Sequence, residues 1–312
     1  MKLISLVIPC YNEREGLSTL LDRLDRVVME LRKQINVEVI LVDDHSTDGS
    51  NLAIRELCRE RDYLRFIRLS RNSGSQVAVI AGMKYAKGDS AVFLAADLQD
   101  PPELIAQMIA KWNEGYDVIW AVRERREGVS KTSVFFSNMF YRLLNGMTEI
   151  RFPKTGADFA LLDKKVVLGL VSSAGSKPSL GALISWLGFK QTEIPYVKEA
   201  RKFGKSKWTL RKKLNAFADA FVGFSYLPMR FMSLIGFVAA ALGFIYAIVV
   251  AVLRFAVGNP IEGWASLMVV ILIIGGLQML MLGVLGEYLW RNLEESRKRP
   301  LFLIEEQEGI ES

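Results

Sequence analysis

The chain has 312 residues, an isoelectric point of about 9.2 and a formal net charge of +6 at pH 7. This length allows one large domain or two smaller ones with a buried core. The basic residues lie mainly beside two long apolar segments, which indicates a membrane surface and phosphate-bearing substrates as partners. No basic face with interleaved aromatic residues is present, so nucleic acid is excluded as a partner. The only histidine, His45, excludes a histidine-cluster metal site.

The first residues and the two cysteines indicate the cellular compartment in which the protein lies. Residues 1–9 are too short for a signal peptide and end at Pro9, so the N-terminal domain is expected in the cytosol. Cys10 and Cys58 are expected to be free thiols in a reducing compartment.

Short apolar runs alternate with helix-like segments over the first 122 residues. Strands are expected at residues 3–8, 37–42, 64–69, 90–95 and 117–122. Helices are expected at residues 13–34, 48–61 and 75–86, and a fourth is expected to begin at Asp100 as N-cap. Asn12 and Glu15 resemble a capping box for the first helix. This order predicts an α/β fold, a mostly parallel sheet with helices on both faces, which binds ligands beyond the carboxyl ends of its strands.

The later part of the catalytic region carries two amphipathic stretches, at residues 131–145 and 207–228, and the second is strongly basic. Such helices can lie at the membrane interface, although ordinary core helices have the same pattern. Late strands are expected at residues 157–162 and 192–197. The cytosolic catalytic domain is therefore expected to cover residues 1–206.

Two segments near the end, residues 231–253 and 264–285, contain no charged side chain. Each is longer than the roughly 20 residues needed to cross the hydrocarbon of a bilayer. A transmembrane hairpin is expected over residues 229–291, with its second helix ending near 286 and a cytosolic tail at 292–312. Because Arg230 and Arg291 flank the spans, we expect a multi-pass protein of the plasma (inner) membrane with its catalytic domain and both termini in the cytoplasm.

Three polar clusters follow successive predicted strands, at residues 9–13, 42–48 and 95–103. One such cluster would be an ordinary turn, but three at the same edge of a sheet indicate a ligand site. Oxygens of Asp97 and Gln99 suit Mg²⁺ or Mn²⁺ bridged to a diphosphate. Asp43 and Asp44 can accept hydrogen bonds from a base or a ribose. Neither a P-loop nor a Gly-x-Gly-x-x-Gly dinucleotide motif is present.

A series of motifs then resembles one family from end to end: Ile8-Pro9-x-Tyr11-Asn12-Glu13, Val42-Asp43-Asp44-x-Ser46-x-Asp48, Arg71-Asn72-x-Gly74, Ala96-Asp97-Leu98-Gln99-Asp100-Pro101-Pro102-Glu103, Gly156-x-Asp158-Phe159, Gly204-x-Ser206-Lys207-Trp208 and Leu285-Gly286-Glu287-Tyr288. In their order and spacing they resemble glycosyltransferase family 2 with a GT-A fold. The resemblance is to polyisoprenyl-phosphate glycosyltransferases, which include dolichyl-phosphate mannose synthases and bacterial undecaprenyl-phosphate glucosyltransferases.

The resemblance implies a role for each matching residue. Those that would bind the nucleotide sugar are Pro9, Tyr11, Glu13, Asp43, Asp44, Asn72, Ala96 and Asp97. The metal would be held by Asp97 and Gln99, and Asp158 would be catalytic with Asp97, beside the anomeric carbon. Those that would receive the lipid phosphate are Arg123, Lys131, Ser137, Arg201 and Lys207.

Two positions depart from the family pattern. Many members have Asp-x-Asp in the fourth-strand motif, whereas Ala95 stands first here, so the metal loses one potential carboxylate. Some relatives carry a basic residue where this chain has Ser133, and Lys131 is expected to substitute for it.

The implied reaction moves a sugar from a nucleoside diphosphate to polyprenyl phosphate, with inversion at the anomeric carbon. Because a phosphate monoester is largely a dianion at pH 7, it needs no strong base. We therefore expect Asp158 chiefly to orient the sugar or a basic side chain, with base catalysis as the lesser alternative.

Several alternatives stay open from the sequence. UDP-glucose is the favoured donor and undecaprenyl phosphate the favoured acceptor, but GDP-mannose, UDP-galactose or a UDP-amino sugar would suit the same site. A non-catalytic membrane partner with a degenerate nucleotide-sugar fold is a different class, favoured only by Ala95. A processive polysaccharide synthase should carry Gln-x-x-Arg-Trp and more spans. Homo-oligomers are expected, as in relatives.

Overall fold

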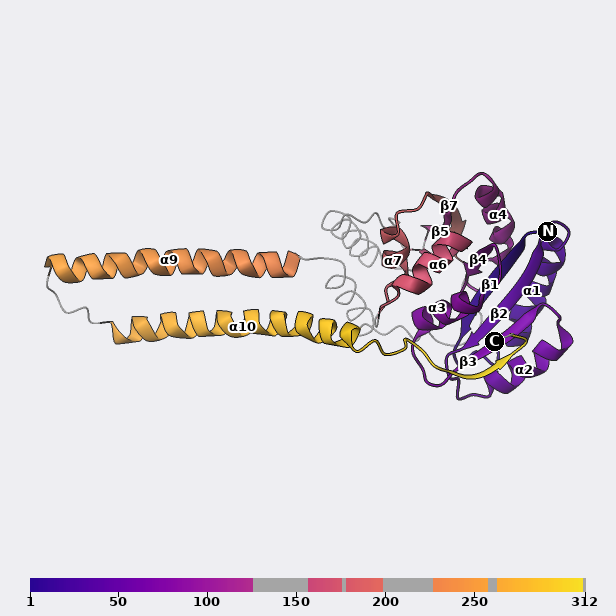
Figure 1. Ribbon diagram of the computed structural model, residues 1–312, viewed down its shortest axis with the longest axis horizontal. Helices are drawn as coiled ribbons and strands as arrows, with labels where there is room; N and C mark the ends of the chain where they lie inside the picture. The colour runs from indigo at the N-terminus through magenta and orange to yellow at the C-terminus, as the bar shows by residue number, and fades with distance from the viewer. Residues whose placement is uncertain (126–156, 176–177, 199–226, 258–262, 311–312) are drawn as a thin grey trace. The chain divides into compact units, whose positions relative to one another are not determined.

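The computed structural model describes residues 1–125, 157–175, 178–198, 227–257 and 263–310 (Figure 1). The chain divides into two compact units. Unit 1 comprises Met1–Asp219 and Pro300–Ser312, and unit 2 comprises Ala220–Arg299. The sequence therefore inserts unit 2 near the end of unit 1.

One mixed sheet of eight described strands forms the centre of unit 1, in the order β7-β5-β6-β4-β1-β2-β3-β8. Its first four strands along the chain are β1 (Leu3–Cys10), β2 (Asn36–Asp43), β3 (Leu64–Leu69) and β4 (Ser90–Phe93). All four are parallel to their neighbours within this group. Each alternation of strand and helix supplies the long connection that parallel pairing needs.

The later strands extend this sheet on both sides: β5 (Val118–Arg125), β6 (Ala157–Asp163), β7 (Gln191–Val197) and β8 (Ile304–Glu308). Strand β6 lies antiparallel between β4 and β5, and β7 pairs parallel with β5. The strands β5 and β7 therefore run in the same direction as β4. The mostly parallel sheet expected from the sequence is confirmed, and six strands present their carboxyl ends at one edge.

Helices cover both faces of the sheet: α1 (Leu17–Leu31), α2 (Ser50–Glu60), α3 (Ser75–Tyr85), α4 (Ile105–Asn113) after the 3₁₀ turn η1 (Pro102–Leu104), α6 (Lys164–Ser173) and α7 (Leu180–Trp186). Alternate residues of β1 explain the two layers. Leu6 and Ile8 join the buried cluster with α1, α2 and α4, whereas Val7 faces α3, where a Cβ on Gly82 would lie 2.3 Å from it. A Gly is therefore needed at position 82 for α3 to approach the sheet.

Two helices begin later than their sequence signals indicate. The helix α1 begins at Leu17 without a side-chain cap, because Asn12 Oδ1 accepts a hydrogen bond from the Thr47 N–H (2.8 Å) instead. Asp100 does not cap η1, whose N-cap is Pro101; its Oδ1 accepts a hydrogen bond from the Tyr196 hydroxyl (2.6 Å). In both places a tertiary contact has taken the side chain that the local pattern assigned to a cap.

The last strand, β8, differs from the expected tail at residues 292–312. Residues 304–308 form an antiparallel edge strand on β3, and residues 300–312 belong to unit 1. Its sequence, Ile-Glu-Glu-Gln-Glu, has no apolar alternation, so nothing local indicates a strand. Pairing with Arg55, Arg59 and Arg68 of unit 1 compensates its negative charge.

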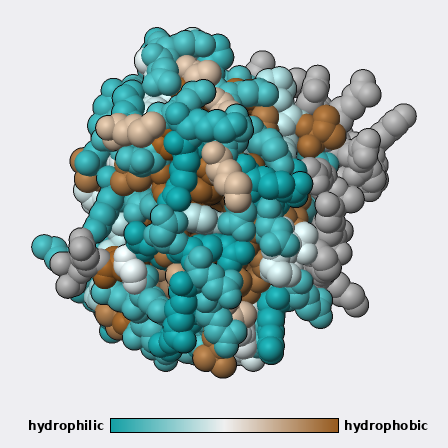
Figure 2. All heavy atoms as spheres, turned by 90° about the vertical axis from the view of Figure 1, so that its right-hand side faces the viewer, coloured by the Kyte–Doolittle hydropathy of each residue, from teal (hydrophilic) through white to brown (hydrophobic). Residues whose placement is uncertain are grey.

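Unit 2 contains the helices α9 (Leu227–Val257) and α10 (Trp264–Ser296), which lie side by side in Figure 1. Their candidate membrane spans are Phe231–Val250 and Val269–Ser296, and the most apolar window of each is 0% buried. Apolar helices of this length suit a bilayer. The face of the molecule drawn in Figure 2 is instead mostly hydrophilic, with hydrophobic side chains only in small groups.

Candidate active site

The loops that follow β1 and β2 are joined by hydrogen bonds across the carboxyl edge of the sheet. The Asn12 N–H donates to Ser46 Oγ (2.9 Å), and the Thr47 N–H donates back to Asn12 Oδ1 (2.8 Å). The Glu13 N–H donates to Ser50 Oγ (3.2 Å). Two of the three polar clusters expected to converge therefore form one connected structure.

Asp43 lies at the end of β2 and is fully buried. Its Oδ1 accepts a hydrogen bond from the Ser46 N–H (3.0 Å), and its Oδ2 lies 2.7 Å from Nη1 of Arg68 on β3. A buried carboxylate requires such partners. Asp43 thus fixes the loop after β2.

Asp44, the next residue, is 3% exposed and ties a third loop to this edge. Its two oxygens accept hydrogen bonds from the N–H groups of Ser73 (2.6 Å) and Gly74 (2.8 Å), which precede α3. Burial raises the pKa of Asp44, and these two N–H groups oppose the rise. Keeping the Asp44 carboxylate ionised in this buried position therefore lowers the stability of the fold.

Backbone strain concentrates at the same edge. Among the described residues, four that are not glycine have positive φ, and three of them follow β1, β2 and β4: Asn12 (51°), His45 (60°) and Leu98 (59°). Such conformations cost roughly 1–3 kcal/mol each and gather at functional sites. The three motif loops share this strain, which fits a binding function better than three ordinary turns.

The loop after β4 carries the candidate metal ligands. The Gln99 N–H donates to Asp97 Oδ1 (3.2 Å), so both residues belong to one tight turn, and both are partly exposed. Over the described ranges no group of three or more His, Cys, Asp or Glu side chains could hold a metal ion. One carboxylate and one amide oxygen fit a hard cation held jointly with a diphosphate, but are too few for one held by protein alone.

A second charged cluster lies beside that loop, where β5 and β7 end. Asp100 is 1% exposed, and its Oδ1 lies 2.6 Å from the Tyr196 hydroxyl and 3.4 Å from Lys198 Nζ. Arg123 of β5 acts electrostatically on both Tyr196 and Lys198, and Asp97 acts on Lys198. Burial lowers the pKa of Lys198, although Asp100 opposes this. Two cations thus stand beside the candidate metal ligands, where an anionic substrate would need them.

The remaining predicted site residues fall into two groups. Pro9 is the next-to-last residue of β1, and Tyr11 and Glu13 follow this strand. Ala96 is buried beside Asp97, and Asn72 is exposed in the loop after β3. Those outside the described residues are Lys131, Ser137, Arg201 and Lys207, together with the amphipathic segment 131–145 and residues 207–226 of the segment 207–228.

Asp158 is described by its backbone alone. It is the second residue of β6, and since β6 runs antiparallel to β4, with Ala160 opposite Phe93, β6 begins at the edge where β4 ends. Its backbone therefore shares an edge with Asp97; its side chain lies outside what the structure describes.

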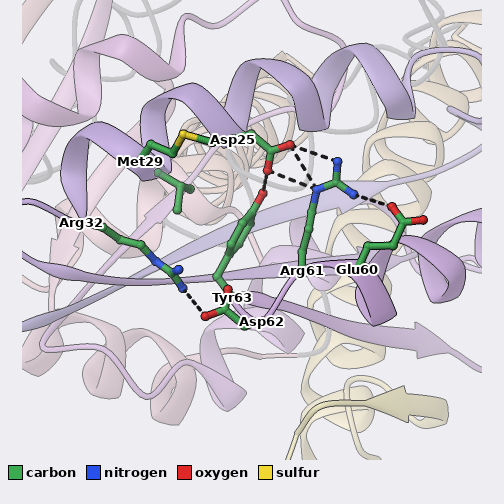
Figure 3. A pocket seen from close by; sticks show the side chains of 8 residues that line it. Asp25, Met29, Arg32, Glu60, Arg61, Asp62 and Tyr63 are labelled. Atoms are coloured by element: carbon green, nitrogen blue, oxygen red, sulfur yellow. Dashed lines mark hydrogen bonds and ion pairs between the residues drawn. The ribbon is translucent and has the colours of Figure 1, made fainter.

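The opposite, amino-terminal edge has an open hollow of about 350 Å³ (Figure 3). Asp25 of α1 accepts hydrogen bonds from Tyr63 and from Arg61 (3.0 Å), and Arg32 pairs with Asp62 (3.1 Å). These side chains satisfy one another. Because ligands of parallel α/β sheets bind at the carboxyl edge, we assign this hollow no part in the site.

Lys198 and Arg68 are two site-edge residues that the sequence reasoning missed. Lys198 directly follows a predicted strand, as the three polar clusters do, so its position in the sequence could have indicated a place at the carboxyl edge. Arg68 sits inside an apolar strand next to Phe66 and Ile67, and nothing local shows that it meets Asp43.

Comparison with known proteins defines the family. The model of "Glycosyl transferase family 2" matches residues 5–170, more than half of the chain. The chain belongs to glycosyltransferase family 2 and is a glycosyltransferase. The family recognised from the motifs is thereby confirmed.

Related sequences match over nearly the whole length. An uncharacterized glycosyltransferase, YkcC, of Bacillus subtilis (strain 168) is 40% identical over 99% of this chain and 95% of its own. The bactoprenol glucosyl transferase of Shigella phage SfV is 32% identical over 96% of this chain and 97% of its own. A prophage bactoprenol glucosyl transferase homolog of Escherichia coli (strain K12) is 33% identical over 96% and 98%. The similarity therefore includes the two apolar helices.

A solved structure supports the fold. The glucosyl-3-phosphoglycerate synthase of Mycobacterium tuberculosis superposes with a TM-score of 0.51 at 15% identity, over 70% of this chain and 78% of that one. At this identity the likeness shows the fold alone, which agrees with the expected GT-A type.

Proposed function

We propose that this glycosyltransferase transfers glucose from UDP-glucose to undecaprenyl or another polyprenyl phosphate, with inversion at the anomeric carbon. The observation that carries the proposal is similarity to bactoprenol glucosyl transferases over 96% of the chain, spans included. The convergence of the loops after β1, β2 and β4 at one edge of the sheet supports it independently.

In the proposed reaction the acceptor phosphate oxygen forms a bond to the anomeric carbon while the bond to the diphosphate breaks on the opposite face. The phosphate is largely a dianion at pH 7 and brings its own electron pair, so no proton has to be removed from it. Negative charge grows on the leaving diphosphate, and fixed cations beside it would lower the barrier. Lys198 is the described candidate for this role, and Arg123 beside it is proposed to receive the lipid phosphate.

Asp97 and Gln99 would hold Mg²⁺ or Mn²⁺ together with the diphosphate, and the bound cation would offset charge on the leaving group. Ala95 leaves Asp97 as the single carboxylate of that set. We therefore expect metal affinity to depend strongly on the nucleotide.

Asp158 is proposed to orient the sugar or a basic side chain. The test is Asp158→Asn with kcat measured between pH 6 and 8. Retention of most of kcat at every pH supports orientation, whereas loss that is steepest at low pH supports the alternative of an essential base.

The proposed membrane setting follows from α9 and α10. Arg230 before the first span and Arg291 after the charge-free residues 264–285 of the second favour a multi-pass protein of the plasma (inner) membrane with the catalytic unit and both termini in the cytoplasm. The amphipathic segments 131–145 and 207–228 are proposed to lie at the head groups, and a homo-oligomer is proposed as well.

The decisive experiment is a donor screen with the full-length protein, undecaprenyl phosphate and Mg²⁺, in which the lipid product is identified by its mass. A hexosyl product from UDP-glucose is expected. Products from GDP-mannose, UDP-galactose or a UDP-amino sugar alone would replace the donor assignment. Absence of transfer from every donor would favour a non-catalytic membrane partner.

A further inference from the structure

The strand β8, which follows the second apolar helix in sequence, occupies the edge of the sheet beside the loops after β1 and β2. It pairs antiparallel with β3, and the Ser70 N–H donates to the Leu303 carbonyl (2.9 Å) just beyond the ladder. An open edge of β3 would expose unpaired backbone groups, so β8 has a structural use. Its side chains indicate a second use.

A one-residue bulge interrupts this pairing at Glu305. Arg68 lies opposite Glu306 and Leu69 lies opposite Ile304, so Glu305 is the extra residue of β8. Bulges turn a side chain away from its regular direction and are common beside active sites. Glu305 Oε2 lies 2.8 Å from Arg68 Nε and 3.2 Å from His45 Nδ1.

Arg68 carries this contact into the interior. The Arg68 side chain is 11% exposed, and its guanidinium binds Glu305 through Nε and the fully buried Asp43 through Nη1 (2.7 Å). Its Nη2 donates to the Ser46 carbonyl (3.4 Å). The planar guanidinium offers its donors in fixed directions, so Glu305 on one side restricts where the others point.

The contacts that begin at Glu305 end at the loops after β1 and β2, which have strained backbone. Asp43 holds the Ser46 N–H, and Ser46 Oγ accepts from the Asn12 N–H (2.9 Å). Asn12 and His45 both have positive φ, and such backbone persists only where surrounding contacts fix it. Glu305 is one of those contacts.

We infer that Glu305 is a positioning residue that sets the loops after β1 and β2 for the nucleotide, acting through Arg68 and Asp43. The inference rests on the proposed function, which places the nucleotide at these loops. The residue touches no expected substrate atom; it fixes the guanidinium that fixes Asp43. The end of the chain beyond the apolar helices thereby takes part in nucleotide binding.

The test is Glu305→Gln in the full-length protein, with Glu306→Gln as the matched control. Glu306 lies on the same strand and pairs with Arg55 (3.4 Å); its charge acts on Arg68, but the hydrogen bond to Arg68 comes from Glu305. Glu305 is 42% exposed, so its amide variant should fold. We expect the KM for UDP-glucose and the Kd for UDP to rise about five-fold in Glu305→Gln, with kcat within about two-fold.

The control variant should leave all three constants within about two-fold, and the two variants should share one Tm. Equal KM in Glu305→Gln and wild type would overturn the inference. Equal increases in both variants would overturn it too, because general docking of β8 would then explain them.

A ligand-free measurement separates this inference from the proposed function. Hydrogen exchange should accelerate at Ser46 and Thr47 in Glu305→Gln but not in Glu306→Gln. If wild type binds no UDP, the proposed function fails while exchange still reports loop positioning. Unchanged exchange in Glu305→Gln, with wild type binding UDP, refutes the positioning role alone.

Discussion

At the amino ends of the strands Asp25 accepts hydrogen bonds from Arg61 and Tyr63. At the carboxyl ends the partners of Asp44 within the described residues are backbone N–H groups. The pKa shifts are opposite. Burial raises the pKa of Asp25, but Arg61 and Tyr63 together lower it by more, so the pKa lies below its ordinary value. For Asp44 the effect of burial is the larger one, and the pKa is raised.

The opposite pKa shifts distinguish a carboxylate that stabilises the fold, Asp25, from one that serves the site, Asp44. The amino-terminal network compensates every charge and stabilises the fold. The carboxyl edge keeps a buried carboxylate and strained loops that the fold alone does not require. Substitutions at the two edges should therefore act on different properties, stability at one and transfer at the other.

Asp97→Asn should have the largest effect, since it removes the single carboxylate of the candidate metal site. We expect kcat for transfer to fall about 10²- to 10³-fold, in the range found when one charge-stabilising group is removed. Steady-state kinetics with Mg²⁺ and a thermal melt would measure it. Asp25→Asn is the control at the other edge; an Asp97→Asn enzyme with more than a tenth of wild-type kcat would remove Asp97 from the site.

Lys198→Gln should act next, and more on transfer than on folding. Its ammonium is half-buried beside Asp100, within the field of Asp97, and would offset charge on an anionic substrate. We expect kcat/KM to fall about ten-fold, with Tm lowered by a few degrees because the buried Asp100 loses its charged partner. Lys165→Gln is a suitable control because Lys165 pairs with Asp117 (2.6 Å) at the start of β5, at the opposite edge. Equal activity of both variants would contradict the role of Lys198.

The carboxyl edge was largely predictable from the sequence, because parallel strands end together and polar clusters follow each of them. The location of Asp43, Asp97 and Gln99 at this edge was predicted in this way, and their roles stay predictions. The contacts around them were not, since Arg68 and Glu305 near Asp43, and Tyr196 on Asp100, come from distant parts of the chain and no local pattern joins them.

Local rules also failed where a tertiary partner was available. Asn12 and Asp100 look like helix caps, but Thr47 and Tyr196 use their side chains. Strand β8 was missed because three glutamates in five residues suggest a solvated tail, and only the arginines of α2 and β3 make a strand there favourable.

Asp25→Asn should change stability and leave transfer intact. The variant weakens a network in which the side chains of Asp25 and Arg61 are 24% and 17% exposed. We expect a loss of about 1–2 kcal/mol, seen as a Tm lower by a few degrees. Thermal unfolding of the full chain in detergent would measure it, and kcat/KM should stay within about two-fold. A large loss of kcat/KM at unchanged Tm would mean that the amino edge takes part in the reaction.

The smallest expected effect is the pH dependence of that difference. Because the folded pKa of Asp25 lies below its ordinary value of 3.8, its contribution is fully present above that value and is lost as pH falls through the folded pKa. The Tm difference between wild type and Asp25→Asn should therefore be constant from pH 5 to 7 and shrink below about pH 4. The pKa of Asp44 is raised, so protonation of Asp44 would favour the folded state as pH falls. Because Asp44 is present in both proteins, its contribution cancels from the Tm difference. A difference that persists unchanged at pH 3 would show that Asp25 acts through packing rather than charge.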